Sequence, residues 1–419
     1  MTDRNINKAA SAAGGVTRRT VVAGIGAAGL VTGTSPFSIV RAAGGPLKVG
    51  VLLPRSGVQA GIGQDCQRGV EVAGPILKEL GLPELQIMNG DTESNEQTAR
   101  AQAEKMIGDG AELLVGAFDS GQSAAIAQVA EQKGVPFVIN IAAAPQITEQ
   151  GYKYVFRNFP TAVTILTDAF NQQKEIFKQI GSAPKSVVFL HVNDTFGTSM
   201  AGGIGKVMPK FDMPYKVADT IAYDRAARDL SVEIAKAKAT GADALLVVSR
   251  LNDAILLTRE LVKQRWTPEA ILSMGPGWYE DQYFKTLGKL SDGPISFVPW
   301  YDPKKKLSQT LKDAMKKAYP DVNLNTNHVY TFEALLVAAD AYKRAGSTDP
   351  KALADAVRTT NITNNVSPGP GIMFNAKGQN DKLKDSAIQN RGGKLVTVAP
   401  KQAANAKVEW PMKPYDKRA

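Results

Sequence analysis

The chain has 419 residues, of which 43% are hydrophobic and 21% charged, and its formal net charge is +10 at pH 7. This length suits two or three domain-sized units with large apolar cores, and the composition is that of a globular protein. One cysteine, Cys66, and two histidines exclude an intramolecular disulfide and a cysteine-based metal cluster, so we expect no metal, no cofactor and no catalytic site.

The positive charge does not indicate nucleic acid as a partner. Residues 1–42 hold five basic residues and one acid, which leaves a charge of +6 for the rest of the chain. The later lysine cluster at residues 304–306 lacks interleaved aromatic residues, so it is predicted to lie on a solvated face.

The stretch from Thr17 to Gly29, TRRTVVAGIGAAG, contains the G-x-G-x-x-G pattern of a dinucleotide-binding turn. Such a turn requires a preceding strand and an acidic residue about twenty positions later. Here polar residues precede the pattern, and no Asp or Glu occurs between Arg4 and Gln64. The pattern therefore does not predict a nucleotide-binding enzyme.

The same stretch has the parts of an export signal. A basic region ends in an arginine pair, a weakly apolar run follows, and small residues allow cleavage before Ala43. Residues 1–42 are thus predicted to be a twin-arginine signal peptide. Since no later run is long and apolar enough to span a bilayer, we expect a soluble periplasmic protein after cleavage.

From Leu47 onward, strand-like and helix-like segments alternate, which predicts an α/β fold with parallel sheets and helices on both faces. Breaks near residues 157–161 and 294–303 divide the strands into groups, and the helical stretch 306–357 is expected to pack back on an earlier sheet. Two lobes connected by several crossings follow from this division. The predicted strands are residues 47–53, 85–88, 111–116, 135–139, 186–190, 215–218, 244–248 and 270–273.

Ligands of open parallel sheets bind beyond the carboxyl ends of the strands. The segment DSGQS, residues 119–123, follows the third predicted strand and enters a helix. Its amides and hydroxyls gather where the helix end is partially positive, which suits a carboxylate. A plain helix cap has the same pattern.

Segments 47–57, 85–91 and 142–157 resemble the periplasmic leucine/isoleucine/valine-binding proteins of ABC transporters, and the resemblance extends to about Val398. It implies the type I periplasmic binding protein fold, with two Rossmann-like lobes, each a parallel-rich sheet with helices on both faces, joined by hinge strands. We expect residues 43–160 and 299–373 in lobe 1, and residues 161–298 and 374–419 in lobe 2.

The resemblance also implies a function. The lobes close on a small solute without catalysis, and the loaded protein, expected to be a monomer, delivers it to ABC permease subunits in the membrane. A ligand-sensing receptor or regulator and an exported α/β hydrolase are the alternatives. The hydrolase needs an activated nucleophile and a base, and the scarcity of histidine argues against it.

The resemblance also implies a set of ligand-binding residues, which are those at the positions where the family contacts its ligand. The ligand carboxylate is expected at Ser120 and the following amides, beside the loop after the fourth strand. Phe196 and Arg250 stand where the family has tyrosines, and Gly277 stands where it has the glutamate that pairs with the ligand ammonium. The expected set is Ser120, Gly121, Gln122, Ile141, Ala142, Ala143, Phe196, Arg250, Gly277 and Trp278.

The missing glutamate argues against a zwitterionic amino acid, because an unpaired buried ammonium costs about 2–5 kcal/mol. Arg250, together with the flat surfaces of Phe196, Trp278 and Tyr279, suits a hydrophobic or aromatic carboxylate. A branched-chain amino acid stays the alternative ligand. For Arg250 itself the alternative is a structural ion pair with Asp253 or Asp224.

Overall fold

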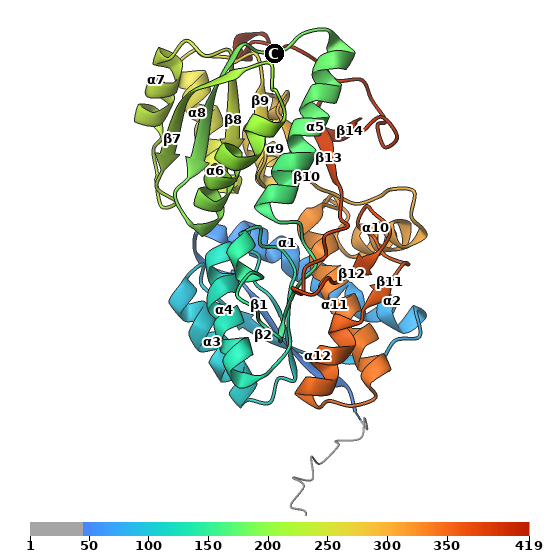
Figure 1. Ribbon diagram of the computed structural model, residues 1–419. Coiled ribbons are helices and arrows are strands. Elements are labelled where there is room, and N and C mark those ends of the chain that lie inside the picture. Colours follow the sequence, from blue (N-terminus) through green and yellow to red (C-terminus); the bar gives the residue numbers. More distant parts are fainter. Residues whose placement is uncertain (1–44, 419) are drawn as a thin grey trace, which may run out of the picture. The chain divides into compact units, whose positions relative to one another are not determined.

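The computed structural model describes residues 45–418, and these lie within one compact unit. Two sheets of strands, each accompanied by helices, make up this unit (Figure 1). The predicted signal peptide, residues 1–42, falls outside the described residues. Within the described part of the chain, no helix has both the length and the apolar character that crossing a membrane requires.

The first sheet has five strands in the order β2-β1-β3-β4-β5, and every pairing in it is parallel. The inner strands β3 and β4 are buried along their whole length. Strands covered on both faces read as continuous apolar runs, which is why their sequences show no polar alternation. The bounds are β1 Leu47–Leu53, β2 Leu85–Asp91, β3 Leu113–Gly116, β4 Phe137–Ile139 and β5 Val155–Arg157.

Successive side chains of β3 serve different cores. Leu114 joins an apolar cluster with helices α3 and α4, whereas Leu113 and Val115 join a cluster with α1 and α11. Helix α11 contacts α1 and β3, so the helical stretch does pack back on the first sheet as expected. The bounds are α1 Ala60–Glu71, α2 Ala73–Glu79, α3 Glu96–Gly108, α4 Ser120–Lys133, α10 Lys306–Ala318, α11 Thr326–Ala345 and α12 Pro350–Arg358.

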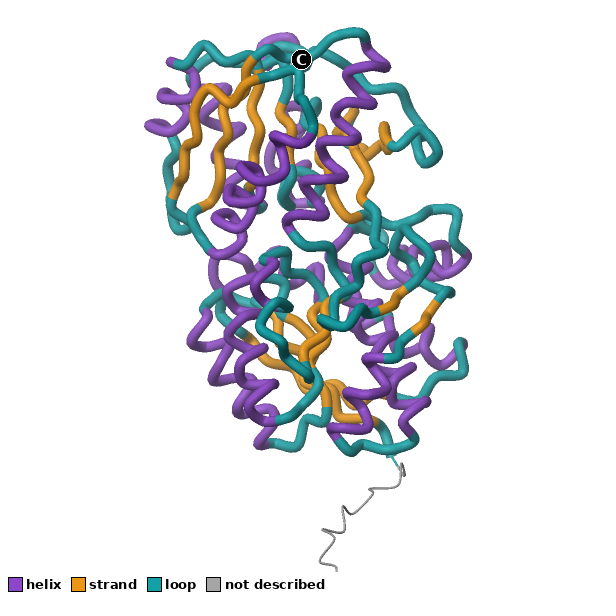
Figure 2. The backbone as a smooth tube through the Cα atoms, viewed as in Figure 1, coloured by secondary structure: helices purple, strands orange, loops and turns teal. Residues whose placement is uncertain are grey.

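The second sheet has seven strands in the order β14-β13-β10-β9-β8-β6-β7. Strands β6 to β10 pair in parallel, and β13 and β14 extend the sheet with antiparallel pairings. In Figure 2 these strands lie among the helices of this part of the chain. The bounds are β6 Ser186–Val192, β7 Lys216–Tyr223, β8 Ala244–Val248, β9 Ile271–Ser273, β10 Ile295–Pro299, β13 Asp385–Arg391 and β14 Lys394–Ala399.

Helix α5 packs against β10 and β13 and contacts α6, whereas α8 contacts α7 and α9. The chain passes between the two sheets three times, after β5, after β10 and before β13. A two-stranded antiparallel ladder, β11 Asn361–Ile362 with β12 Ile372–Met373, lies in sequence between the second and third passages. The remaining helix bounds are α5 Ala162–Ile180, α6 Thr195–Val207, α7 Ser231–Ala239, α8 Leu251–Lys263 and α9 Asp281–Leu287.

The prediction that residues 294–303 form only a break is wrong, because β10 lies within them. Prolines at both ends of this five-residue strand look like loop signals, yet the strand is wholly buried between β9 and β13. The first sheet likewise has five strands where the sequence predicts four. Its extra strand, β5, has only three residues and lies directly before the predicted break.

Helix α6 begins very close to the end of β6. A Cβ atom added to Gly197, in the first turn of α6, would lie 1.7 Å from the carbonyl oxygen of Val192. The absent side chain at Gly197 therefore lets Asp194 cap α6 directly beyond the strand, where its Oδ1 accepts the backbone N–H of Gly197 at 2.9 Å.

We predict that Gly197→Ala lowers the free energy of unfolding by about 3 kcal/mol, because the new methyl group meets backbone that cannot rotate away. Gly202→Ala in the same helix is the matched control, since its Cβ would have open space. That substitution should raise stability by about 0.5–1 kcal/mol. Urea denaturation measures both, and equal effects of the two substitutions would contradict the prediction.

Candidate functional site

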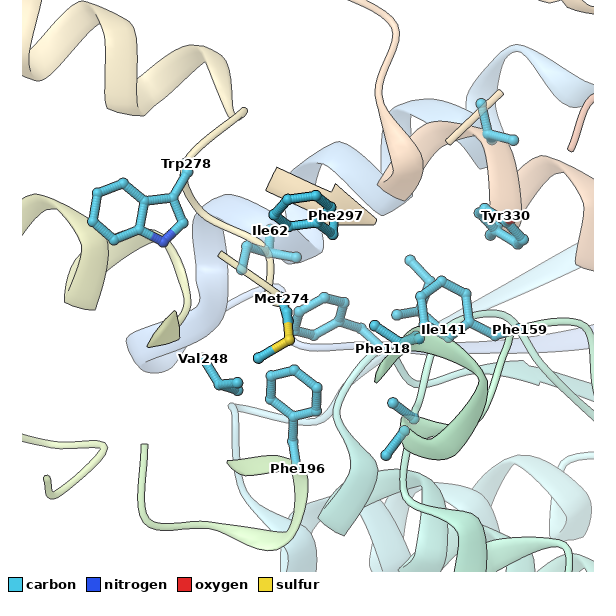
Figure 3. Close-up of a cluster of buried hydrophobic side chains, with 14 of the residues drawn as sticks. Ile62, Phe118, Ile141, Phe159, Phe196, Val248, Met274, Trp278, Phe297 and Tyr330 are labelled. Carbon is cyan, nitrogen blue, oxygen red and sulfur yellow. The ribbon is translucent and has the colours of Figure 1, made fainter. Parts of the chain in front are cut away.

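A cavity lies beyond the carboxyl ends of strands from both sheets. Its wall is mostly aliphatic and aromatic, and Figure 3 shows Phe118, Phe196 and Met274 turned toward one another there. The position agrees with the rule for open parallel sheets. The lining residues are Phe118, Ser120, Ile141, Ala142, Ala143, Phe159, Ile165, Phe196, Arg250, Met274, Gly275, Pro276, Tyr279, Val298, Pro299, Thr326 and Asn327.

Six of the ten expected ligand-binding residues line this cavity, namely Ser120, Ile141, Ala142, Ala143, Phe196 and Arg250. The other four lie elsewhere. The backbone N–H groups of Gly121 and Gln122 donate to Asp119 Oδ1 at 2.9 and 3.1 Å, so the start of α4 is capped by a carboxylate of its own chain.

Gly277 and Trp278 also do not line the cavity, and the structure gives each of them a packing role. Gly277 has a φ of 106°, and a Cβ there would lie 2.4 Å from the backbone of Arg250. The indole of Trp278 is fully buried and donates from Nε1 to Ser249 Oγ at 2.7 Å. Trp278 lies apart from the cavity side chains in Figure 3. As ligand contacts, these residues and the two amides after Ser120 stay predictions.

Ser120 is positioned to donate a hydrogen bond into the cavity. Its Oγ accepts the backbone N–H groups of Ala143 and Ala144 at 3.2 and 3.3 Å. These bonds join the loop after β4 to the start of α4. They use the oxygen as an acceptor, which leaves the hydroxyl hydrogen to serve as a donor.

Arg157 at the end of β5 holds the same loop from behind. Its Nη1 donates to the carbonyl oxygens of Ala142 and Ala144 at 2.9 and 2.7 Å. Its Nε donates to Gln379 Oε1 at 2.6 Å, in the segment that leads back to the second sheet. The wall formed by the loop after β4 is therefore fixed by a buried guanidinium and does not depend on a ligand for its shape.

Arg250, 6% exposed, lies between two aspartates. Its Nη2 donates to Asp119 Oδ2 at 2.6 Å and its Nη1 to Asp194 Oδ2 at 2.5 Å. The guanidinium carbon lies 5.2 Å from the centre of the Phe196 ring. Nε has no hydrogen-bond partner. Because Asp119 follows β3 and Arg250 follows β8, this ion pair connects the loops of the two sheets.

The pKa shifts at this cluster follow from burial and from the ion pairs. Burial acts to raise the pKa of Asp119, but the Arg250 guanidinium and a hydrogen bond from Gln59 outweigh it, and the pKa lies below its usual value. Burial acts to lower the pKa of Arg250, but Asp194 and Asp119 outweigh it and raise the pKa. Both shifts favour the charged forms of Asp119 and Arg250 at neutral pH.

The sequence left a structural ion pair of Arg250 with Asp253 or Asp224 as an alternative, and both of these partners are wrong. The guanidinium pairs with Asp119 and Asp194, not with Asp253 or Asp224. Asp253 instead accepts the backbone N–H of Arg250 at 2.9 Å, because it stands three residues into α8, where a carboxylate satisfies the free amide before a helix.

Several cavity residues were missed by the sequence reasoning. Val298 and Pro299 belong to β10, which was taken for a break, and Met274 follows β9 without any polar pattern to mark it. Thr326 and Asn327 begin α11, far along the chain from every other loop of the site. The Asn-Thr-Asn run at the start of this helix is a capping signal, and it is the sequence feature that could have marked these residues.

A family model described as periplasmic binding protein matches residues 46–383. The chain therefore belongs to the periplasmic binding protein family, as its sequence predicts. Among curated proteins, Leu/Ile/Val-binding protein homolog 8 of Brucella abortus is 26% identical over 390 residues, which cover 89% of this chain and 95% of that protein.

Solved structures share the fold. The leucine-binding protein LivK of Thermotoga maritima has a TM-score of 0.73 and 22% identity, and the match covers 84% of this chain and 98% of that one. A solute-binding protein of R. palustris, solved in complex with benzoate, has a TM-score of 0.72 and 21% identity, with coverages of 87% and 100%. The predicted type I periplasmic binding protein fold is confirmed.

We predict that Arg250→Met lowers the free energy of unfolding at pH 7 by about 3–5 kcal/mol, because Asp119 and Asp194 then stay buried without a cation. Without Arg250, burial raises the pKa of these carboxyls above the unfolded value. Protonation then relieves them, and the destabilisation shrinks as the pH falls from about 7 to about 5.

Urea denaturation at both pH values measures this effect. Arg259→Met is the matched control, because Arg259 lies on the exposed side of the same helix and its loss should change stability by about 0.5 kcal/mol or less. A destabilisation by Arg250→Met that is the same at both pH values would show that the aspartates do not depend on this cation.

Proposed function

We propose that this protein is the periplasmic solute-binding component of an ABC transporter and that its solute is a small hydrophobic or aromatic carboxylate. The observation that carries the proposal is the charge of the cavity wall. Among the described residues that line the cavity, Arg250 is the one charged side chain, and none is an Asp or Glu. A carboxylate finds hydrogen-bond donors there, whereas an ammonium finds no anion of its own.

Two donors support the carboxylate end of the proposal. The Nε–H of Arg250 has no partner, and the Ser120 hydroxyl hydrogen is available toward the same cavity. The two aspartates nearest to the cavity, Asp119 and Asp194, are both engaged by Arg250, so neither is free to pair with a ligand ammonium. We propose that the carboxylate binds at Nε of Arg250 and at Ser120.

The remaining wall supports an apolar body for the solute. Phe118 and Phe159 come from two different loops and Phe196 from the first turn of α6, and Met274 lies beside Phe118 and Phe196. The solved relative whose structure holds benzoate shows that this fold accommodates an aromatic acid.

A branched-chain amino acid is the second candidate. The curated relatives are named Leu/Ile/Val-binding protein homologues, and LivK is described as a leucine-binding protein. In this chain, however, none of the described lining residues is an Asp or Glu that could pair with the ammonium group of such a ligand.

Capture by closure is part of the proposal, with lobe 1 made of residues 43–160 and 299–373 and lobe 2 of residues 161–298 and 374–419. Three contacts support it, since each joins a residue of lobe 1 to a residue of lobe 2: Arg250 with Asp119, Asn252 Nδ2 with the carbonyl oxygen of Val58 at 2.9 Å, and Gln146 with Ser199 at 3.3 Å. We propose that the exported protein acts as a monomer, converts no substrate and docks on membrane permease subunits.

The discriminating test uses acids that differ only in the amino group, measured by isothermal titration calorimetry on the purified protein. The pairs are leucine with 4-methylpentanoate and phenylalanine with 3-phenylpropanoate, and benzoate is added as a compact aromatic acid. The acid without the amino group should bind more tightly in each pair by about 2–5 kcal/mol, because no lining carboxylate offsets the desolvation of an ammonium.

Tighter binding of leucine than of 4-methylpentanoate would contradict the proposal and favour the branched-chain amino acid. Thermal shift gives an independent readout, since a ligand at a hundredfold excess over its dissociation constant stabilises the protein by about 2.7 kcal/mol. Chemical conversion of any of these ligands by the protein would overturn the assignment as a binding protein.

A further inference from the structure

Asn327 presents a buried carboxamide to the cavity. It lies in the first turn of α11, it is 1% exposed, and it lines the cavity wall. Its Oδ1 has no hydrogen-bond partner, whereas the amide side of the group lies against the buried carboxyl of Glu280. Leaving a buried polar group unpaired costs about 1–3 kcal/mol, and such groups in native structures call for an explanation.

The neighbouring polar residues do not share this property. The hydroxyl of Thr326 donates to the carbonyl oxygen of Pro299 at 2.5 Å, and Asn325 accepts the backbone N–H of Asn327 at 2.9 Å as the cap of α11. The first turn of the helix is therefore already satisfied without the Asn327 side chain. Its carboxamide is not needed as a cap, and the cavity is where its hydrogen-bonding capacity is available.

The surroundings of Asn327 fit an uncharged partner. Glu280, which precedes α9 and is buried, is the acid beside it. Burial and the nearby Asp65 raise the pKa of Glu280 well above its usual value, and Asn327 acts in the opposite direction. The raised pKa favours the neutral form of this carboxyl, so it offers a cationic group near Asn327 a weaker ion pair than an ordinary carboxylate would.

We propose that Asn327 determines specificity by binding a hydroxyl group that the ligand carries in addition to its carboxylate. This inference rests on the proposed function, which places the carboxylate at Arg250 and Ser120. A carboxamide offers both a donor and an acceptor, and a hydroxyl group is their complement because it also offers both. The apolar wall formed by Tyr279, Val298 and Pro299 limits competition from water.

Matched acids with and without a hydroxyl group test the inference by isothermal titration calorimetry. The pairs are benzoate with 3- and 4-hydroxybenzoate, and phenylacetate with 4-hydroxyphenylacetate, so that the hydroxyl group is offered at different distances from the carboxylate. At least one hydroxylated acid should bind about tenfold more tightly than its parent, because a site built around a buried polar group rejects the analogue that leaves it unpaired.

Asn327→Leu, which is nearly the same size and has no polar atom, should abolish or reverse this preference, measured as the ratio of the two dissociation constants within each pair. Asn327→Ser serves if the leucine variant does not fold, and it should reduce the preference in part. Met274→Leu is the matched control, since it conserves volume in the same cavity and should change both members of a pair alike.

The outcomes separate this inference from the proposed function. If the parent acids bind but hydroxylation never strengthens binding, or if Asn327→Leu leaves the preference unchanged, the assignment of Asn327 is overturned and the carboxylate site stands. If no acid of the panel binds, the carboxylate proposal is overturned, and the assignment of Asn327 with it.

Discussion

The arrangement of the site depends on the guanidinium of Arg250 held between Asp119 and Asp194. Each aspartate serves two purposes at once, because its Oδ1 caps a helix, α4 or α6, while its Oδ2 binds the arginine. The loops after β3, β6 and β8 thereby take their positions from a single cluster. Buried charges persist only when they are paired, so none of the three residues is replaceable by itself.

This cluster also decides what the cavity offers to a ligand. Had Asp119 or Asp194 faced the cavity unpaired, the site would suit an ammonium, and the amino-acid candidate would be the stronger one. Because both are bound to Arg250, the polar groups available to a ligand include the Nε of Arg250, the hydroxyl hydrogen of Ser120 and the carboxamide oxygen of Asn327. The rest of the wall supplies apolar area, which gives affinity, while these few groups give orientation.

Much of this was predictable because strands buried on both faces and the helices between them leave strong local patterns. The eight predicted strands all exist, although β7 continues five residues beyond its predicted end, and the residues after β3, β4, β6 and β8 supply six expected cavity residues. Strands β5 and β10 were missed because one has three residues and the other is enclosed by prolines. In both cases the partner strands, which are distant in sequence, stabilise what the local sequence does not signal.

The sequence by itself determined the family, the α/β fold and the edge of the sheets where the cavity lies, since these follow from periodicity and from short segments. Only the tertiary structure decided which groups at that edge are engaged. The partners of Arg250 lie 131 and 56 residues away along the chain, and Asn327 reaches the cavity only because α11 packs back on the first sheet. Pairing of charges and loss of hydrogen-bond partners depend on distances of a few ångströms between such segments, and no local pattern encodes them.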